Sequence, residues 1–262
     1  MSDPAVLRRS RLQRMLATRG FVRVADASLE LGVSEVTIRA DLSALERAGG
    51  AVRVHGGAMP PDALAREAPV ESTRAEHAGA KRAIGAVAAA LVSAGDCIYL
   101  DAGSTALAVA EALVRRRELR DVVVVTSALP IALALEPGIP RLEVLVTGGT
   151  LRPLQHSLVN PFAAPMMAAL RFDLALIGCT GIHPVHGVTN VNLPEAEIKT
   201  LAMHAAARSV LIADADKLDR VDPAVIGRID AFSTLVTAGE APGDALDRLT
   251  AGGLEVLSAD RT

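Results

Sequence analysis

Small polar residues follow the segments of the sequence that have the apolar pattern of buried β-strands. These segments are 97–100, 122–125, 142–146, 174–177 and 210–213, and the residues after them that could bind a ligand are Asp101, Gly103, Ser104, Thr105, Thr126, Gly148, Gly149, Arg152, Asp214 and Lys217. Hydroxyl and N–H groups bind phosphate and sugar oxygens, and the two basic side chains add positive charge. Taken singly, each residue fits ordinary turn chemistry. Together they favour a site for a small, anionic, hydroxyl-rich ligand.

Among these segments, Gly103-Ser104-Thr105 has the composition of a phosphate site. It directly follows one predicted strand and opens a predicted helix at 105–116. A glycine turn, two hydroxyls and free N–H groups at a helix N-terminus together can hold a phosphate. A serine or threonine at the start of a helix is also a common N-cap, so this simpler interpretation stays open.

The elements that must position these residues form an α/β pattern. Helical patterns at 81–93, 105–116, 129–135, 162–170, 194–207 and 244–249 alternate with the strands above and with shorter strands at 235–236 and 254–257. Continuous apolar strands between helices predict a mostly parallel sheet covered on both faces. Ligands of such sheets bind at the carboxyl ends of the strands, so the polar residues are expected on one edge.

A second functional segment lies at residues 31–58. Ser34 is placed to cap a helix that ends at Gly49-Gly50, and Arg53 and His55 then alternate with valines as in a short exposed strand. A helix with a polar and basic outer face, followed by a basic hairpin, suits the DNA major groove with a wing beside it. The residues expected to contact DNA are Ser34, Glu35, Val36, Thr37, Arg39, Arg53 and His55. The alternative is an ordinary amphipathic helix followed by a turn.

The residues before this segment complete a small DNA-binding unit. A helix is expected near residues 6–16, a short strand at 21–24 that could pair with the wing, and a supporting helix at 25–31. Gly32 makes the turn into the recognition helix. The order helix, strand, helix, turn, helix, wing therefore predicts an α+β winged helix-turn-helix.

Residues 31–58 closely resemble the N-terminal winged helix-turn-helix of the DeoR family of bacterial regulators. The matching residues are Val33-Ser34, Thr37-Ile38-Arg39, Asp41-Leu42, Leu45-Glu46 and Arg53-Val54-His55-Gly56-Gly57-Ala58. Ala40 departs from the family pattern, because members often carry a second arginine there. The departure would remove a phosphate contact or reflect a different operator.

The resemblance extends over the rest of the chain, from Lys81-Arg82-Ala83-Ile84 to the segment Asp214–Lys217. These residues match the DeoR-type sensor domain, which is similar in fold to ribose-5-phosphate isomerase and whose effectors are typically phosphorylated sugars. The resemblance implies the following roles: Gly103, Ser104 and Thr105 hold the phosphate, Asp101, Thr126, Gly148 and Gly149 line the sugar, and Lys217 supplies positive charge. Ser127 stands where members usually have asparagine, which implies an altered effector preference.

Composition and charge agree with two domains of unequal size. The boundaries predicted are a DNA-binding domain at 1–58, a proline-containing connector at 59–80 and an effector-sensing domain at 81–262. Of the 262 residues, 50% are hydrophobic and only 2% aromatic, so the core must be aliphatic. Residues 1–59 contain nine arginines and six acidic residues, whereas residues 60–262 contain 18 basic and 24 acidic ones. A basic head on an acidic body fits a protein that meets DNA with one end.

Two classes of function compete, a regulator that binds a sugar phosphate and a sugar-phosphate isomerase with a DNA-binding head. The isomerase that the sensor resembles has acidic residues in a D-G-A-D-E loop, whereas the corresponding strand end here, Gly178–Ile182, has no carboxylate. Glu195 and Glu197 could approach the cleft or simply stabilise the start of their helix. Binding without turnover is therefore favoured. A pure oligomerisation scaffold would leave the strand-end residues unexplained.

The remaining residues that could do chemistry show weaker patterns. His183 and His186 lie three apart in a loop without further metal ligands nearby, and Cys97 and Cys179 lack a metal-type spacing, so no metal or cofactor is expected. No apolar run approaches the ~20 residues of a membrane helix, and the N-terminus lacks the pattern of a signal peptide, which favours a cytoplasmic protein. The expected partners are a double-stranded DNA operator, a phosphorylated sugar and further copies in a homodimer or homotetramer.

Overall fold

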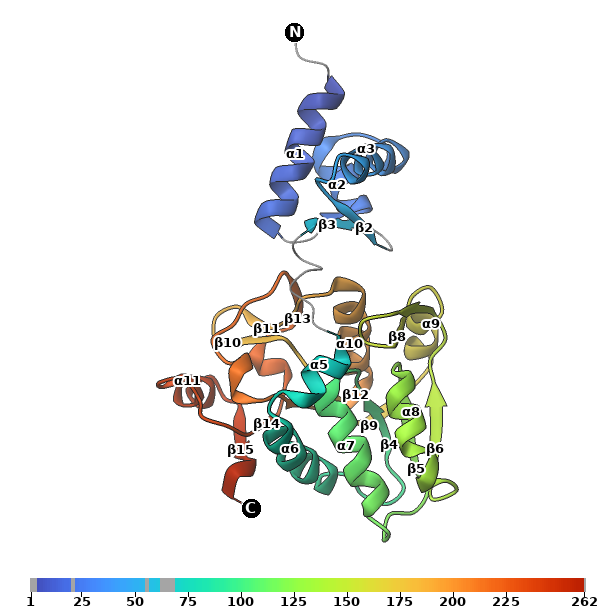
Figure 1. The fold of residues 1–262 in the computed structure, drawn as a ribbon, viewed down its shortest axis with the longest axis vertical. Helices are drawn as coiled ribbons and strands as arrows, with labels where there is room; N and C mark the ends of the chain where they lie inside the picture. The colour runs from blue at the N-terminus through green and yellow to red at the C-terminus, as the bar shows by residue number, and fades with distance from the viewer. Residues whose placement is uncertain (1–3, 20–21, 55–56, 62–68, 262) are drawn as a thin grey trace. The chain divides into compact units, whose positions relative to one another are not determined.

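The computed structural model describes residues 4–19, 22–54, 57–61 and 69–261. The chain folds into two compact units, an N-terminal head and a larger α/β unit (Figure 1). The predicted turn of the wing, His55-Gly56, lies outside the described residues.

The head is a winged helix-turn-helix, as the sequence predicts. Its elements in chain order are α1 (Pro4–Arg19), β1 (Val22–Arg23), α2 (Val24–Leu31), α3 (Glu35–Arg47), β2 (Val52–Val54) and β3 (Gly57–Met59). The strands form an antiparallel sheet in the order β1-β3-β2, so the strand before α2 pairs with the wing. β3, the second strand of the predicted hairpin, runs one residue beyond the boundary expected at residue 58.

Local interactions define both ends of α3. The Ser34 hydroxyl accepts the Thr37 N–H at 3.2 Å and so caps one of the free donors of the first turn. At the other end, Gly49 has φ +71°, a conformation that costs glycine little, and the next N–H returns to the Leu45 carbonyl at 2.9 Å. The inner face buries Ile38, Leu42 and Leu45. The start, the end and the inward side of the recognition helix therefore follow from the local sequence.

The α/β unit is built on a parallel sheet. Among the described residues, its strands are β4 (Cys97–Leu100), β5 (Val122–Thr126), β6 (Leu142–Val146), β9 (Phe172–Ile177), β12 (Ala206–Ile212), β14 (Thr234–Thr237) and β15 (Glu255–Ser258), in the order β15-β14-β12-β9-β4-β5-β6. All of these strands pair in parallel. The predicted α/β architecture with a mostly parallel sheet is confirmed.

Both faces of this sheet are buried. Alternate side chains, such as Ile98 and Leu176, pack in one aliphatic core with α6 (Ala78–Ala90), α7 (Ser104–Arg115) and α8 (Leu129–Leu135), the helices in front of the sheet in Figure 1. Tyr99 points to the opposite face and is equally inaccessible to solvent. Two-sided burial explains why the central strands are continuously apolar instead of alternating.

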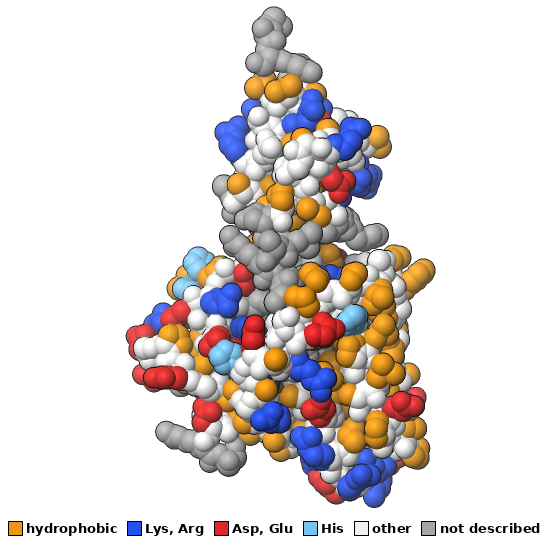
Figure 2. All heavy atoms as spheres, viewed as in Figure 1, with side chains coloured by type: hydrophobic (Ala, Val, Ile, Leu, Met, Phe, Trp, Pro, Cys, Tyr) orange, Lys and Arg blue, Asp and Glu red, His pale blue; other side chains and the backbone are white. Residues whose placement is uncertain are grey.

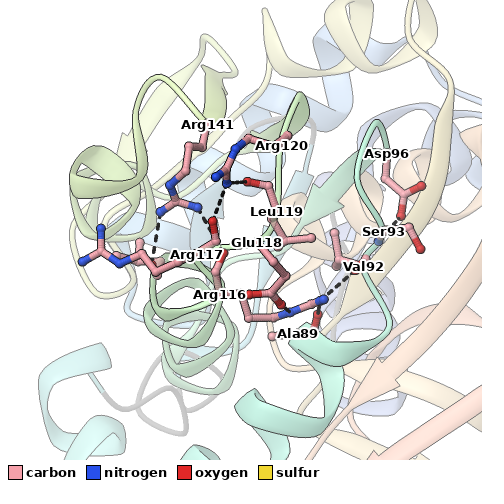
Figure 3. Close-up of polar contacts among 11 residues, drawn as sticks. Ala89, Val92, Ser93, Asp96, Arg116, Arg117, Glu118, Leu119, Arg120 and Arg141 are labelled. Carbon is pink, nitrogen blue, oxygen red and sulfur yellow. Dashed lines mark hydrogen bonds and ion pairs between the residues drawn. The ribbon is translucent and has the colours of Figure 1, made fainter.

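Arginines close the ends of α6 and α7 that lie away from the carboxyl edge (Figure 3). Arg116 donates from Nη1 to the carbonyl of Ala89, at 2.6 Å, in the last turn of α6, and to that of Val92, at 2.7 Å, just after the helix. Arg141 donates from its two terminal nitrogens to the carbonyl of Val114, at 3.2 Å, in the last turn of α7, and to that of Arg116, at 3.1 Å, just after the helix. The last carbonyls of a helix outnumber the N–H donors available to them, so the guanidinium groups add hydrogen bonds at these two helix ends. Arg116, in the basic segment 115–120, thus helps to hold α6 and α7 together.

Further strands and helices complete the α/β unit. They include the hairpin β7 (Thr150–Arg152) and β8 (Ser157–Val159), the strands β10 (Gly181–His183), β11 (Gly187–Asn190) and β13 (Ala224–Gly227), and the helices α9 (Ala163–Ala168), α10 (Leu193–Ala205) and α11 (Ala245–Ala251). The sequence predicts a loop around His183 and His186, where the structure has the β10–β11 hairpin; β7, β8 and β13 were not predicted. None of the helices in the described part of the chain is long and apolar enough to cross a membrane.

Residues 70–75, which the sequence analysis places in the connector, form α5 (Val70–Ala75). This helix packs against α7, where Arg74 lies 2.8 Å from Glu111. The Nζ atom of Lys81 donates to the carbonyls of Thr73 and Glu76, the latter at 2.8 Å. The second half of the expected connector is therefore folded onto the α/β unit.

Candidate functional site

The outer face of α3 carries most of the residues expected to contact DNA. Ser34, Glu35, Val36 and Arg39 are exposed, and Thr37 is partly exposed. Val36, the residue after Glu35, is 73% exposed. These side chains lie on the solvent-facing side of α3, opposite the buried Ile38, Leu42 and Leu45.

Two arginines of the head are oriented by neighbours. The Nη2 atom of Arg39 lies 2.6 Å from the Oε2 atom of Glu35, one turn earlier on α3. Arg53, on β2, donates from Nη1 to the Ser43 hydroxyl at 2.9 Å, and its backbone N–H donates to Glu46 at 3.1 Å. The wing strand is thus tied to the recognition helix. His55 lies outside the described residues, so its expected DNA contact stays a prediction.

Asp41 holds α1 against α3. Its carboxylate is buried and accepts from Arg8, while Arg9 lies 3.8 Å from the other oxygen. A buried charge must be paired, and here the pair joins two helices. Asp41 belongs to the motif of this segment for a structural reason, not as a DNA contact.

The strand order brings the central strand ends of the α/β unit together. Asp101 follows β4, Gly178 follows β9 and Asp214 follows β12, and these three strands are neighbours in the order β12-β9-β4. Adjacent strands lie about 4.8 Å apart. Cys179, a partly exposed residue after Gly178, lies among the charges of this edge, since Lys199, Lys217, Asp214 and Asp101 all act on its thiol. Desolvation raises the pKa of this thiol to about 12. Asp101, Asp214 and Lys217 therefore lie near one another at this edge.

Lys199 on α10 anchors the centre of this edge. Its Nζ atom lies 2.9 Å from Oδ2 of Asp101 and donates to the Gly178 carbonyl at 3.0 Å, while the Gly178 N–H donates to the same Asp101 oxygen at 2.8 Å. Burial raises the pKa of Asp101, although the Lys199 charge opposes the shift. Burial works against the charged form of Lys199, but Asp101 and Glu195 outweigh it and raise the lysine pKa. Both charged groups of this ion pair therefore have hydrogen-bond partners within the protein.

Glu195, one turn before Lys199 on α10, joins that helix to the β7–β8 hairpin. Its Oε1 atom accepts from Arg152 and from the Ser157 hydroxyl, the latter at 2.5 Å. Burial opposes its ionisation, but the charges of Arg152 and Lys199 prevail and lower the pKa of the carboxyl. Arg152, expected as a ligand contact, is therefore already paired with a buried carboxylate.

Asp214 has the most unusual environment on the edge. Its side chain is 2% exposed, and neither carboxylate oxygen has a hydrogen-bond partner. Two ammonium groups flank it at longer range, Lys81 at 3.9 Å and Lys217 at 3.8 Å. Burial is the first cause that lowers the Lys81 pKa, while Asp214 opposes the shift. A buried carboxylate that accepts no hydrogen bond is costly unless a ligand supplies donors.

Further hydroxyls at this end of the sheet also lack partners. The buried oxygens without a hydrogen bond include Thr147 after β6, Thr180 after β9 and Thr237 at the end of β14. Each belongs to a strand end of the same parallel sheet. Unpaired polar atoms concentrated in this way mark a place where polar ligand atoms or water bind.

The N-terminus of α7 presents the expected phosphate segment. Gly103 precedes the helix and provides no side-chain cap, and Ser104 and Thr105 are partly exposed in its first turn. The first N–H groups of a helix have no acceptor within it. Neither hydroxyl caps the helix, as an ordinary N-cap serine or threonine would. The N–H groups of the first turn therefore remain available as donors.

The other expected contacts have structural duties. Thr126 is fully buried, and its hydroxyl accepts the Ala128 N–H at 3.1 Å. A Cβ atom added to Gly149 would lie 1.8 Å from the Val159 carbonyl oxygen, so only glycine lets β7 approach β8. Gly148 is exposed beside it, at the edge strand β6. These residues lie two strands or more from Asp214 and its lysines.

The histidine pair of the β10–β11 hairpin is also engaged. The Nδ1 atom of His183 accepts the N–H groups of Val185, at 3.1 Å, and His186, at 3.3 Å, and the two imidazole rings lie 4.7 Å apart. No group of three potential ligands that could hold a metal ion occurs among the residues that the structure describes. Both cysteines are free thiols.

Sequence reasoning missed Lys199 and Lys81 as site residues. Lys199 follows Glu195 by four residues after a proline, which places both side chains on one helix face. That spacing was a usable signal. Nothing local indicated that Lys81 would reach Asp214, because the two residues are 133 positions apart in the sequence and meet only in the folded sheet.

Comparison with known proteins identifies both units. The family model described as "DeoR-like helix-turn-helix domain" matches residues 8–63, and the one described as "DeoR C terminal sensor domain" matches residues 76–238. Solved structures that resemble the chain include ribose-5-phosphate isomerase A from Neisseria gonorrhoeae, with 16% identity, a TM-score of 0.39 and 52% of each chain covered. Another is the full-length sorbitol operon regulator SorC from Klebsiella pneumoniae, with 13% identity, a TM-score of 0.36 and 83% and 91% coverage.

Curated relatives match over nearly the full length. The HTH-type transcriptional regulator GlpR of Haloferax volcanii is 31% identical over 95% of this chain and 96% of its own. The putative aga operon transcriptional repressor of Escherichia coli O157:H7 is 31% identical over 95% and 92%. The lactose phosphotransferase system repressor of Lactococcus lactis is 29% identical over 85% and 87%. With its DNA-binding head and its sensor domain, this chain belongs to the DeoR family of transcriptional regulators.

Proposed function

We propose that this regulator is a repressor of carbohydrate-metabolism genes that is controlled by a phosphorylated sugar bound at the carboxyl edge of the sensor sheet. It binds a double-stranded operator through α3 and the wing, and it acts in the cytoplasm, where operator and sugar phosphate meet. Relatives named after an aga operon and a lactose phosphotransferase system support a role in sugar metabolism.

One observation carries the ligand assignment: the buried Asp214 carboxylate has two oxygens without a donor and lies between two lysines. Sugar hydroxyls are donors of the kind that this carboxylate needs. The unpaired hydroxyls of Thr180 and Thr237 belong to the strands on either side of β12, so they extend the same polar surface. A polyhydroxylated ligand would satisfy all of these groups together.

The phosphate belongs at the start of α7. The free N–H groups and hydroxyls of Ser104 and Thr105 supply donors, and the helix N-terminus favours negative charge. Lys217 is 27% exposed, so its ammonium group can turn from Asp214 towards a phosphate. Asp101, held by Lys199 between these two regions, lines the sugar between them.

Binding without turnover fits the site better than isomerisation. Sugar-phosphate isomerisation needs a base that exchanges a proton near neutral pH. The pKa of Glu195 is lowered and that of Lys199 is raised, and each is paired with an opposite charge. Both groups therefore stay charged across the neutral range instead of trading protons with a substrate.

The experiment that tests this assignment is calorimetry of the purified chain with phosphorylated and free forms of the same sugars, with and without operator DNA. Phosphorylated sugars should bind, and the free forms should bind much more weakly. Lys217→Ala and Ser104→Ala should weaken binding, and Arg171→Ala, at the opposite end of the same sheet, should not. Because linkage is reciprocal, operator DNA must change the effector affinity by the factor with which the effector changes operator affinity.

Two results would contradict the proposal. Equal binding of phosphorylated and free sugars would show that the start of α7 does not bind a phosphate. Conversion of an aldose phosphate into a ketose phosphate at an enzymatic rate would instead show that the sensor domain catalyses isomerisation.

A further inference from the structure

The free edge of the sensor sheet carries an apolar surface. We define this apolar edge surface by Leu129, Leu133, Ile139, Val146, Leu151 and Phe162, whose exposed fractions range from 36% to 70%. Figure 2 shows hydrophobic side chains gathered over the region where Figure 1 places α8 and β6. A soluble domain rarely leaves such a patch uncovered without a use for it.

Contacts along the edge make this surface continuous. Helix α8 packs against β6, and Ile139 lies in the short connection between them. The Leu129 N–H donates to the His156 carbonyl at 3.0 Å, which ties α8 to the hairpin that carries Leu151. Phe162 covers the far end of β6, since its Cβ atom lies 3.1 Å from the position of a Cβ on Gly148.

The backbone of β6 is also available. In the described residues, β6 pairs with β5 on one side and is the last strand of the sheet. The Thr147 N–H and the Arg141 carbonyl bond to β5. The backbone N–H and C=O groups of the odd-numbered residues of β6 therefore point towards β5. The N–H and C=O groups of Leu142, Val144 and Val146 consequently point to the free edge. Edges of this kind pair with another strand unless they are blocked.

We propose that this edge binds a second copy of the same chain, with the two β6 strands paired antiparallel about a twofold axis at Val144. In that register Val144 pairs with its own copy and Leu142 pairs with Val146 of the second copy, so every outward backbone group gains a partner. Glu143 then faces Leu145 of the second copy and not another glutamate. The self-pairing therefore avoids a repulsion between like charges directly opposite each other.

The size of the surface fits a dimer. Six large apolar side chains with these exposed fractions present roughly 600 Å², and the backbone edge adds to it, which approaches the ~800 Å² that each partner contributes to a standard interface. A twofold dimer also matches the needs of the head, because winged helices read half-sites in pairs. A second copy is thus a better occupant than an unrelated protein.

Sedimentation velocity on the full-length chain tests the surface. The wild-type chain should sediment with the mass of at least two chains. Leu133→Lys/Phe162→Lys should halve the mass of the particle, because it places charges in the interface. Val185→Lys is the matched control: Val185 is 81% exposed and lies outside the surface, so its assembly should equal that of the wild type. Circular dichroism confirms that each variant is folded.

Cysteine pairing tests the register. Residues 143 and 145 of opposite copies form a closely spaced, non-hydrogen-bonded pair in the proposed arrangement. Mixed Glu143→Cys and Leu145→Cys chains should therefore form a disulfide-linked heterodimer on mild oxidation, and Glu143→Cys alone should give far less product. A monomeric wild-type chain, or an oligomer that the double lysine variant leaves intact, would overturn the proposal. Oligomers without the mixed disulfide would overturn the pairing of the β6 strands.

Discussion

The Nζ atom of Lys199 lies 2.9 Å from the Oδ2 atom of Asp101, and this buried ion pair joins α10 to the carboxyl end of β4. Both side chains are almost inaccessible to solvent. Because Gly178 bonds to both partners, the pair also fixes the adjacent strand end. The centre of the candidate effector site is therefore set by a contact between residues 98 positions apart in the sequence.

Removing one member of this pair should destabilise the sensor domain strongly. Lys199→Met leaves Asp101 buried without its cation, and such a loss typically costs about 3–5 kcal/mol. Urea unfolding should show this decrease. Asp101→Asn/Lys199→Met should recover a large part of it, because neither buried charge remains. The matched control is Lys217→Met, which removes a partly exposed lysine. A stability of Lys199→Met equal to that control would argue against the ion pair.

The pKa of Glu195 predicts a specific loss of stability in acid. The folded carboxyl has a pKa below its ordinary value of 4.5, so the unfolded chain binds the proton more readily. Ionised Glu195 therefore contributes stability above about pH 4.5, and this contribution disappears as the pH falls through the lowered pKa. Urea unfolding below pH 4.5 should be less pH-dependent in Glu195→Gln than in the wild type. Glu240→Gln, at an exposed carboxyl, should keep the wild-type dependence.

Gly149 should prove to be a structural residue. An alanine there has φ near +143° and a Cβ atom 1.8 Å from the Val159 carbonyl oxygen, so the β7–β8 hairpin must shift. Backbone strain alone costs about 1–3 kcal/mol. Gly149→Ala should lower thermal stability more than Gly95→Ala, where φ is +85° and nothing lies within 4 Å. Equal effects of the two variants would mean that the close approach to β8 is easily relieved.

Arg39 should contribute directly to operator binding. It is exposed on α3 and held in place by Glu35 at 2.6 Å. If Arg39 contacts a base, Arg39→Ala should weaken operator binding by about 1–3 kcal/mol. If Arg39 contacts a phosphate, the variant should bind more weakly and its operator affinity should depend less on salt concentration. Titrations by fluorescence anisotropy at several salt concentrations distinguish the two cases. Arg117→Ala, in the sensor domain, is the control; unchanged affinity of Arg39→Ala would mean that α3 docks differently.

The sequence alone determined the winged helix and the general plan of the sensor domain. Ser34 caps α3 and Gly49 ends it through contacts within a few residues, so local spacing suffices to predict them. Apolar runs likewise predict the parallel strands, and the chemistry of parallel sheets then assigns the residues after them to one edge. A resemblance carried by ordered motifs was enough to identify the family.

Only the tertiary structure decided which of those edge residues work together. The strand order places Asp214 and Asp101 on either side of β9, whereas Gly149 lies at the far edge of the sheet. Lys81 comes from α6, before β4, and Lys199 from α10, between β9 and β12, and no local pattern encodes contacts between residues so far apart in the sequence. The burial that leaves the Asp214 carboxylate without a donor arises from the packing of the whole sheet end, because local spacing carries no information on which groups are cut off from water.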